Sequence, residues 1–223
     1  MRPIVAVHFP SRPGLVHPAL ALLAAALLFA VPAARAQFGA PSYTQVHDAS
    51  ALKPPAGHSV AIIEFEDLEC PDCAHANPLL KEAAEKYGIP WIRHDFPLPF
   101  HNWSFQAAVN ARYFDTRSLA LGSEYRDYIF ANQISIETPG ELQQFTQRFA
   151  DAHKIALPFA IDPMGKLAEQ VKADYALGQR IGIEHTPTIW VVTNAAHAAP
   201  FVEVVDRSKL YQLIDQALAE AKR

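Results

Sequence analysis

The sequence lacks the features of a membrane-spanning or nucleic-acid-binding protein. Its longest unbroken apolar run, residues 19–31, has 13 residues, whereas a helix that crosses a bilayer needs about 20. The formal net charge is −4 and no stripe of basic residues runs along the chain, which excludes the electrostatic footprint of a nucleic-acid-binding surface. Only two of the 223 residues are cysteines, so a disulfide within the chain can join only Cys70 and Cys73.

The first residues have the three parts of a secretory signal. Arg2 and Arg12 make a positive region, residues 19–31 are apolar, and an A-x-A cleavage motif ends at Ala36. We therefore expect residues 1–36 to be a signal peptide that is cleaved near Ala36, and the protein to be periplasmic or otherwise exported. An uncleaved N-terminal anchor is the alternative.

The rest of the chain has the size of one domain with a sizeable core. Three of the 19 basic residues and none of the 23 acidic ones lie in the signal, so the remainder carries a net charge of −7. Disulfides persist in exported compartments. Because there is no third cysteine, a reactive pair in this chain must act on the thiols of other molecules.

The first half of the domain predicts a strand, a helix and a second strand. Residues 37–57 form an N-terminal leader, since prolines and glycine interrupt them and apolar periodicity is weak. The β-branched, apolar run 59–65 predicts a strand buried on both faces. A helix from the cysteines to Tyr87, ended by Gly88, and a strand over 89–96 should follow. This order is a βαβ unit, which implies a parallel pair in an α/β sheet.

Four predicted helices follow, and then the sheet resumes. These helices cover 103–114, 119–132, a segment opened by the capping box at 138–141, and a segment opened by Asp162-Pro163 and ended by Gly178 or Gly182. Strands are expected over 188–192 and 201–205, and Asp206 should cap a last amphipathic helix. The helical region therefore lies between two parts of one sheet.

The two cysteines, separated by Pro71 and Asp72, form the candidate site. Cys70 lies where a helix begins, where free backbone N–H groups stabilise a thiolate, and Pro71 suits the first helical turn. Disulfide exchange needs an exposed, ionised attacking thiol, here Cys70, and a second thiol, Cys73, that resolves the mixed disulfide. A zinc site needs about four ligands and only His75 is near the two thiols. A purely structural disulfide would close too small a loop to remove much unfolded-chain entropy.

These features resemble the thioredoxin superfamily, and most of all its exported DsbA-like thiol:disulfide oxidoreductases. The resemblance rests on residues 63–65 (Ile-Glu-Phe), on 70–73 (Cys-Pro-Asp-Cys) and on 186–188 (Thr-Pro-Thr) before a strand. It implies an α/β thioredoxin fold, a central mixed sheet flanked by helices, over residues 58–223. The helical subdomain at about 102–182 would then be an insertion.

The resemblance also implies roles by position. Glu64 matches a buried acid that moves protons to and from the inner thiol, and burial would raise its pKa towards neutrality. A glutamate that faces solvent at a strand edge is the alternative. Pro187 matches a cis-proline packed against the disulfide, where the Thr186 backbone pairs with a substrate strand. An ordinary trans proline is the alternative there.

Two positions depart from the pattern or add to it. DsbA-type oxidases typically carry a histidine where this chain has Asp72. A carboxylate beside Cys70 should raise the thiol pKa relative to a histidine-bearing site, so we expect a more reducing potential than that of a typical DsbA. Acids within residues 66–69 should act in the same direction. His185 either tunes pH response and substrate choice at the rim of the site or is simply a loop residue.

The sequence thus predicts a thiol:disulfide oxidoreductase that acts on unfolded or cysteine-containing exported proteins. Its redox-active disulfide Cys70–Cys73 would serve without another cofactor, a metal or nucleic acid. The resemblance implies a membrane redox partner, and the leader 37–57 is too short for the dimerisation domain of family isomerases, so a monomer is expected. The alternatives are a reductase or isomerase-type role, a non-catalytic chaperone or binding protein, and a metal carrier.

Overall fold

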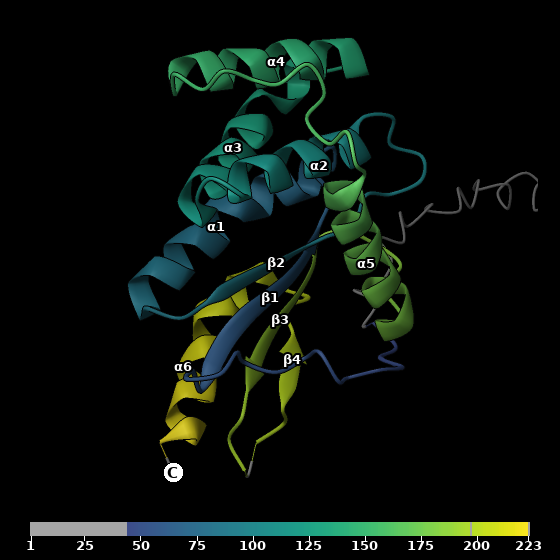
Figure 1. Cartoon of the computed structure of the whole chain (residues 1–223). Helices are drawn as coiled ribbons and strands as arrows, with labels where there is room; N and C mark the ends of the chain where they lie inside the picture. The colour runs from purple at the N-terminus through teal and green to yellow at the C-terminus, as the bar shows by residue number, and fades with distance from the viewer. Residues whose placement is uncertain (1–43, 197, 223) are drawn as a thin grey trace, which may run out of the picture. The chain divides into compact units, whose positions relative to one another are not determined.

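A four-stranded mixed sheet with the order β2-β1-β3-β4 lies at the centre of the fold (Figure 1). The computed structural model describes residues 44–196 and 198–222. The strands are β1 Val60–Glu66, β2 Trp91–Asp95, β3 Thr188–Thr193 and β4 Phe201–Glu203. Strand β1 is parallel to β2 and antiparallel to β3, and β3 is antiparallel to β4. The predicted βαβ unit and mixed sheet are confirmed.

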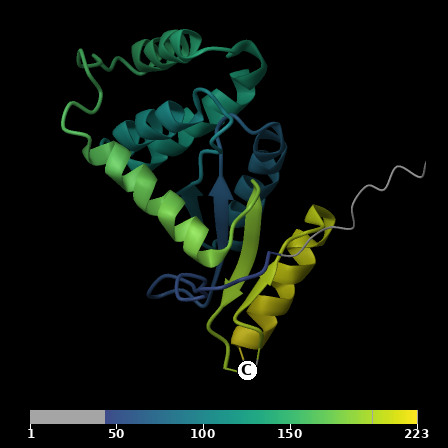
Figure 2. The same ribbon diagram turned by 90° about the vertical axis from the view of Figure 1, so that its right-hand side faces the viewer.

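Helices cover both faces of the sheet and one of its ends. They are α1 Pro71–Tyr87, α2 Ser104–Asp115, α3 Leu119–Asn132, α4 Pro139–Ala152, α5 Lys166–Ile181 and α6 Leu210–Ala221, with short 3₁₀ helices η1 Gln133–Ser135 and η2 Arg207–Lys209. Helices α1 and α6 pack on one face and α5 packs on the other, while α2, α3 and α4 lie beyond the end where β1 finishes (Figures 1 and 2). The predicted helical insertion between two parts of the sheet is confirmed.

Side chains of β1 alternate between the two covered faces. Ile62 packs in the cluster beneath α1 and α6, whereas Ile63 and Phe65 pack in the cluster beneath α5. Alternation along a strand therefore directs Glu64 to the same side as Ile62, towards α1. This register places a carboxyl group under the helix that begins at the cysteines.

The helix boundaries confirm some sequence signals and correct others. Helix α1 ends where Gly88 adopts a φ of 61°, and α4 opens with the predicted capping box. The prediction that Asp162-Pro163 opens a helix is wrong, because a turn intervenes in which Gly165 N donates to Asp162 O at 3.2 Å. Helix α5 starts only at Lys166 and ends at Ile181, where the C-cap residue Gly182 has a φ of 104°. The last helix, α6, is preceded by η2, and Asp206 caps η2 rather than α6.

The described part of the leader packs against the fold. His47 N donates to Ile181 O at 2.8 Å, and Thr44 bonds through its N and its Oγ1 to the Glu203 carboxylate at 2.6 and 3.0 Å. Leu52 is buried. The predicted signal peptide lies outside the described residues. Within the described residues, none of the helices is both long and apolar enough to cross a bilayer.

Candidate redox site

The two cysteines lie at the start of α1, and both are free thiols. Cys70 is the N-cap residue, and Pro71 occupies the first helical position, as predicted. Cys73 has no exposed surface, whereas 7 % of Cys70 is exposed. The expectation of an openly exposed attacking thiol is therefore too strong. The outer thiol is less accessible than predicted because the segment before β3 packs on it.

That segment holds Thr186 and Pro187. The Thr186–Pro187 peptide bond is cis, as the resemblance implied, so the trans alternative is wrong. The Cys70 thiol donates to Thr186 O at 3.3 Å. This contact joins residues 116 positions apart in the chain and places the start of β3 beside the sulfur.

The surroundings of Cys70 favour its thiolate. The pKa of Cys70 is lowered from 9.0 to about 6, chiefly by hydrogen bonding from the Cys73 thiol, with further help from the Thr186 side chain and from the backbone N–H groups of Cys73 and Asp72. Burial opposes this change. The outer thiol is thus ionised at neutral pH, as disulfide exchange requires.

The surroundings of Cys73 favour its thiol form. Burial raises its pKa well above 9.0, and the hydrogen bond to Cys70 and the charge of Glu64 act in the same direction. The backbone N–H of Asp67, which donates to Cys73 Sγ at 3.4 Å, acts in the opposite direction but does not outweigh burial. The pair therefore consists of one thiol that ionises easily and one that must lose a proton before it can attack.

Glu64 is buried beneath α1, with 1 % of its surface exposed, so the solvent-facing alternative is wrong. Its Oε2 accepts a hydrogen bond from Trp91 Nε1 at 3.0 Å, and its Oε1 has no hydrogen-bond partner among the described residues. The pKa of Glu64 is raised from 4.5 to about 8, chiefly by burial and also by the charge of Glu66, while Arg93 and the Trp91 hydrogen bond act in the opposite direction. A carboxyl with such a pKa can both hold and release a proton near neutrality.

Asp72 does not act on Cys70 as an unpaired negative charge. Its Oδ1 accepts a hydrogen bond from Arg207 Nη2 at 2.6 Å, and its carbonyl oxygen accepts one from Arg207 Nη1 at 3.2 Å. Its backbone N–H lowers the pKa of Cys70. The sequence argument considered only the carboxylate and missed the arginine from η2.

The other acids near the site also have partners. Glu66 is bonded to Arg93 at 2.6 Å and Asp67 to His101 at 2.7 Å. The Glu69 carboxylate accepts hydrogen bonds from backbone N–H groups at the start of α2, at 2.7 Å from Trp103 and 2.9 Å from Ser104. The expectation that these acids raise the Cys70 pKa is not supported, because each charge has a local partner and none of the acids is among the main causes that set that pKa.

His185 is exposed in the loop before the cis peptide bond. Its carbonyl oxygen accepts a hydrogen bond from Thr188 Oγ1 at 2.7 Å, which supports the turn into β3. His75 is exposed on α1. Among the described residues, no group of three or more His, Cys, Asp or Glu side chains is placed to hold a metal ion.

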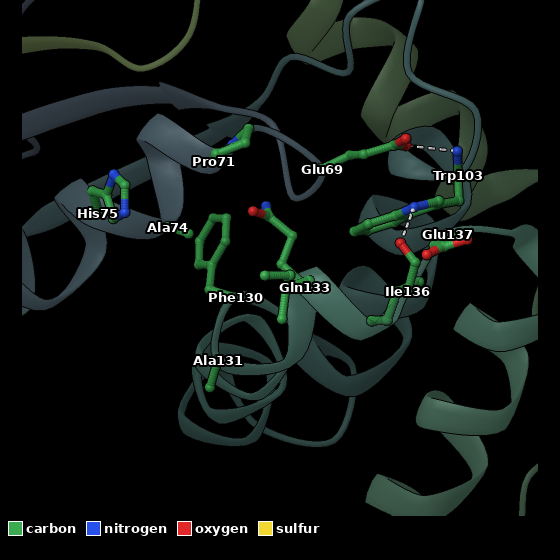
Figure 3. A pocket seen from close by; sticks show the side chains of 11 residues that line it. Glu69, Pro71, Ala74, His75, Trp103, Phe130, Ala131, Gln133, Ile136 and Glu137 are labelled. Atoms are coloured by element: carbon green, nitrogen blue, oxygen red, sulfur yellow. Dashed lines mark hydrogen bonds between the residues drawn. The ribbon is translucent and has the colours of Figure 1, made fainter.

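A pocket of about 490 Å³ opens beside the first turn of α1 (Figure 3). Pro71, Ala74 and His75 lie on one side, Phe130 and Gln133 lie across from them, and Trp103 lies at the end away from His75. Trp103 is held by a hydrogen bond from its Nε1 to Ile136 O at 3.0 Å. The pocket therefore presents apolar surface directly next to the residue that follows Cys70.

A protein-family model described as thioredoxin matches residues 56–208, more than half of the chain. The chain belongs to the thioredoxin family. Its thioredoxin-like fold, with extra helices between the strands, resembles that of DsbA proteins at low sequence identity. No curated protein matches the chain.

Three solved structures illustrate the likeness. Wolbachia pipientis α-DsbA1 is 18 % identical, with a TM-score of 0.62 over 76 % of this chain and 91 % of that one. The thiol-disulfide exchange protein α-DsbA2 of the same organism is 18 % identical, with a TM-score of 0.55 over 74 % and 84 %. A periplasmic thioredoxin-like protein from Salmonella enterica serovar Typhimurium is 18 % identical, with a TM-score of 0.56 over 82 % and 93 %.

Proposed function

We propose that this thioredoxin-family protein is a thiol:disulfide oxidoreductase that exchanges disulfides with exported, cysteine-containing polypeptides. The observation that carries the proposal is the asymmetry of the pair: Cys70 ionises with a pKa of about 6, and Cys73 is fully buried with a raised pKa. Such an arrangement suits one thiol for exchange with a client and the other for resolving the mixed disulfide.

Reduction of a client disulfide would take two steps. The Cys70 thiolate attacks one client sulfur, forms a mixed disulfide and expels the other client sulfur as a thiolate, which takes up a proton. Cys73 then passes its proton to the Glu64 carboxylate and attacks Cys70 Sγ, releasing the second client thiolate and closing the Cys70–Cys73 disulfide. Oxidation of a client dithiol runs through the same steps in reverse, with protonated Glu64 returning the proton to Cys73.

The backbone next to Cys70 supports the proposal that a client chain binds there. The Thr186 carbonyl and the cis peptide bond lie beside Cys70, where an extended client segment can pair with the backbone ahead of β3. The apolar pocket next to Pro71 lies on the first turn of the same helix. Export to the periplasm, a monomeric state and a membrane partner that re-oxidises the pair belong to the same proposal.

Turnover of a disulfide substrate tests the proposal. With glutathione as the reductant, the wild-type chain should accelerate insulin reduction and the refolding of a scrambled disulfide protein. Cys70→Ser should abolish both activities, and Cys73→Ser should accumulate a mixed disulfide between Cys70 and the client, visible on a non-reducing gel. Full activity in Cys70→Ser would contradict the proposal that Cys70 catalyses disulfide exchange, and it would favour a non-catalytic binding role.

A further inference from the structure

Arg207 reaches the dipeptide between the two cysteines from the far end of the chain. Its guanidinium donates to two atoms of Asp72, Oδ1 at 2.6 Å and the carbonyl oxygen at 3.2 Å. The two residues are 135 positions apart, so the contact depends entirely on the tertiary fold. The same fork of donors therefore holds both the side chain and the main chain of Asp72.

The backbone of Arg207 is itself held in place. It opens η2, whose N-cap Asp206 accepts hydrogen bonds from the N and Oγ of Ser208 at 3.0 and 2.7 Å. Helix α6 follows directly, and Leu210 and Ile214 pack in the same cluster as Ala76 and Leu80 of α1. The first turn of α6 also contacts the end of α1, where the Tyr87 and Tyr211 rings lie 6.0 Å apart. With α6 fixed in this way, the Arg207 side chain extends from η2 to the first turn of α1.

We propose that Arg207 is a positioning residue for the redox pair, acting through Asp72 to stabilise the Cys70 thiolate. Two effects combine. The guanidinium offsets the Asp72 carboxylate, which would otherwise repel a thiolate one helical turn or less away. The hydrogen bond from Arg207 to the Asp72 carbonyl restrains the Asp72–Cys73 peptide, and the N–H of that peptide, on Cys73, stabilises the Cys70 thiolate. The inference rests on the proposed function, because only a redox-active Cys70 gives this contact a role.

Other groups also act on the Cys70 thiolate. Cys73 and the backbone N–H of Asp72 come from α1, Thr186 comes from the segment before β3, and the Glu64 carboxyl from β1 interacts with the Cys70 charge. Removal of the Arg207 guanidinium should therefore lower the ionised fraction of Cys70 only in part. The ion pair is partly exposed, with 35 % of the Arg207 and 54 % of the Asp72 side chain accessible, so its effect should be modest and sensitive to salt.

The test measures the ionisation of Cys70 in the purified, reduced protein, by thiolate absorbance and by the pH dependence of iodoacetamide alkylation. Arg207→Gln should lower the thiolate-to-thiol ratio of Cys70 at pH 6 by about threefold, in keeping with a partly exposed ion pair. The glutathione equilibrium should shift towards the protein disulfide by a similar factor. Arg207→Lys, which keeps the charge, should recover part of the loss, and 1 M salt should reduce the difference between wild type and Arg207→Gln.

Two further variants separate this role from a general effect of surface charge. Lys209→Gln removes an exposed positive charge from the same 3₁₀ helix and should leave Cys70 ionisation nearly unchanged. In an Asp72→Asn background, Arg207→Gln should have much less effect than in the wild type. The inference is overturned if Arg207→Gln leaves Cys70 unchanged, if Lys209→Gln shifts it equally, or if the Asp72→Asn background does not alter the effect. None of these readouts needs a client, so failure here is distinct from failure of the exchange assay.

Discussion

The buried carboxyl of Glu64 should make the stability of the protein fall as the pH rises, and Glu64→Gln should remove that dependence. An acid whose pKa is higher in the folded chain than in the unfolded chain contributes stability that is complete below the unfolded value and is lost as pH rises through the folded value. For Glu64 these values are 4.5 and about 8. The loss should therefore occur between about pH 5 and pH 8.

The magnitude follows from the shift in pKa. Each pH unit within this window is worth about 1.4 kcal/mol, so the contribution of Glu64 falls by up to about 4 kcal/mol between pH 5 and pH 8. Glutamine has a similar shape, can still accept the Trp91 Nε1 hydrogen bond and does not ionise. Relative to the wild type, Glu64→Gln should gain stability by nearly this amount over the same window.

The measurement requires the disulfide form of the protein. In the reduced form Cys70 acts in the opposite direction, because its pKa is lowered from 9.0 to about 6 and its contribution is lost as pH falls through the lower value. Urea denaturation of the disulfide form at pH 5, 6, 7 and 8 avoids this opposing contribution. Glu184→Gln, which removes an exposed carboxylate, is the matched control and should leave the pH dependence unchanged. An identical slope for wild type and Glu64→Gln would refute the reasoning.

Three other predictions follow from particular contacts. The rate of Cys70 alkylation should rise with a midpoint near pH 6, and a midpoint near 9 would contradict the thiolate geometry. The reduction potential, measured against glutathione, should lie between the roughly −120 mV of strongly oxidising DsbA and the roughly −270 mV of thioredoxin, since Asp72, whose charge Arg207 offsets, leaves the site without the thiolate-stabilising histidine typical of DsbA oxidases; a value near −120 mV would contradict this. Thr138→Ala, which breaks the capping box of α4, should lower the free energy of unfolding by about 1 kcal/mol in urea denaturation, and no loss would show that the cap is dispensable.

The elements nearest the cysteines could be predicted because their signals are local. The apolar run of β1, the proline at the start of α1 and the glycine with positive φ at its end each reflect the chemistry of neighbouring residues. Asp162-Pro163 shows the limit of such signals. It has the residue types of a helix start, but the chain makes a turn that ends at Gly165 before the helix begins, and Asp162 Oδ2 instead bonds Ala168 N in the first turn at 2.8 Å.

The site divides in the same way. Some site residues could be identified from their spacing in the family motif, namely Cys70, Cys73, Glu64 and the Thr186–Pro187 segment. Trp91, Arg207 and Trp103 could not be assigned roles at the site, since each comes close to it only through folding. Trp91 reaches Glu64 because β2 pairs with β1, and this pairing places Trp91 opposite Ile62. No sequence pattern links Arg207 to Asp72, and they meet only because α1 and α6 pack on the same face of the sheet.

Glu69, which precedes Cys70 in the chain, also holds the start of the inserted helices. Glu69 receives the free amides that open α2, at Trp103 and Ser104, and therefore ties the insertion to the peptide just ahead of the reactive sulfur. A tilt of α2 would pull on that peptide, as well as on β2, to which Arg112 of α2 is joined through Asp95. A chimera carrying the insertion of another family member would therefore need an acceptor at position 69 to keep its cysteine pair in register with the cis peptide bond.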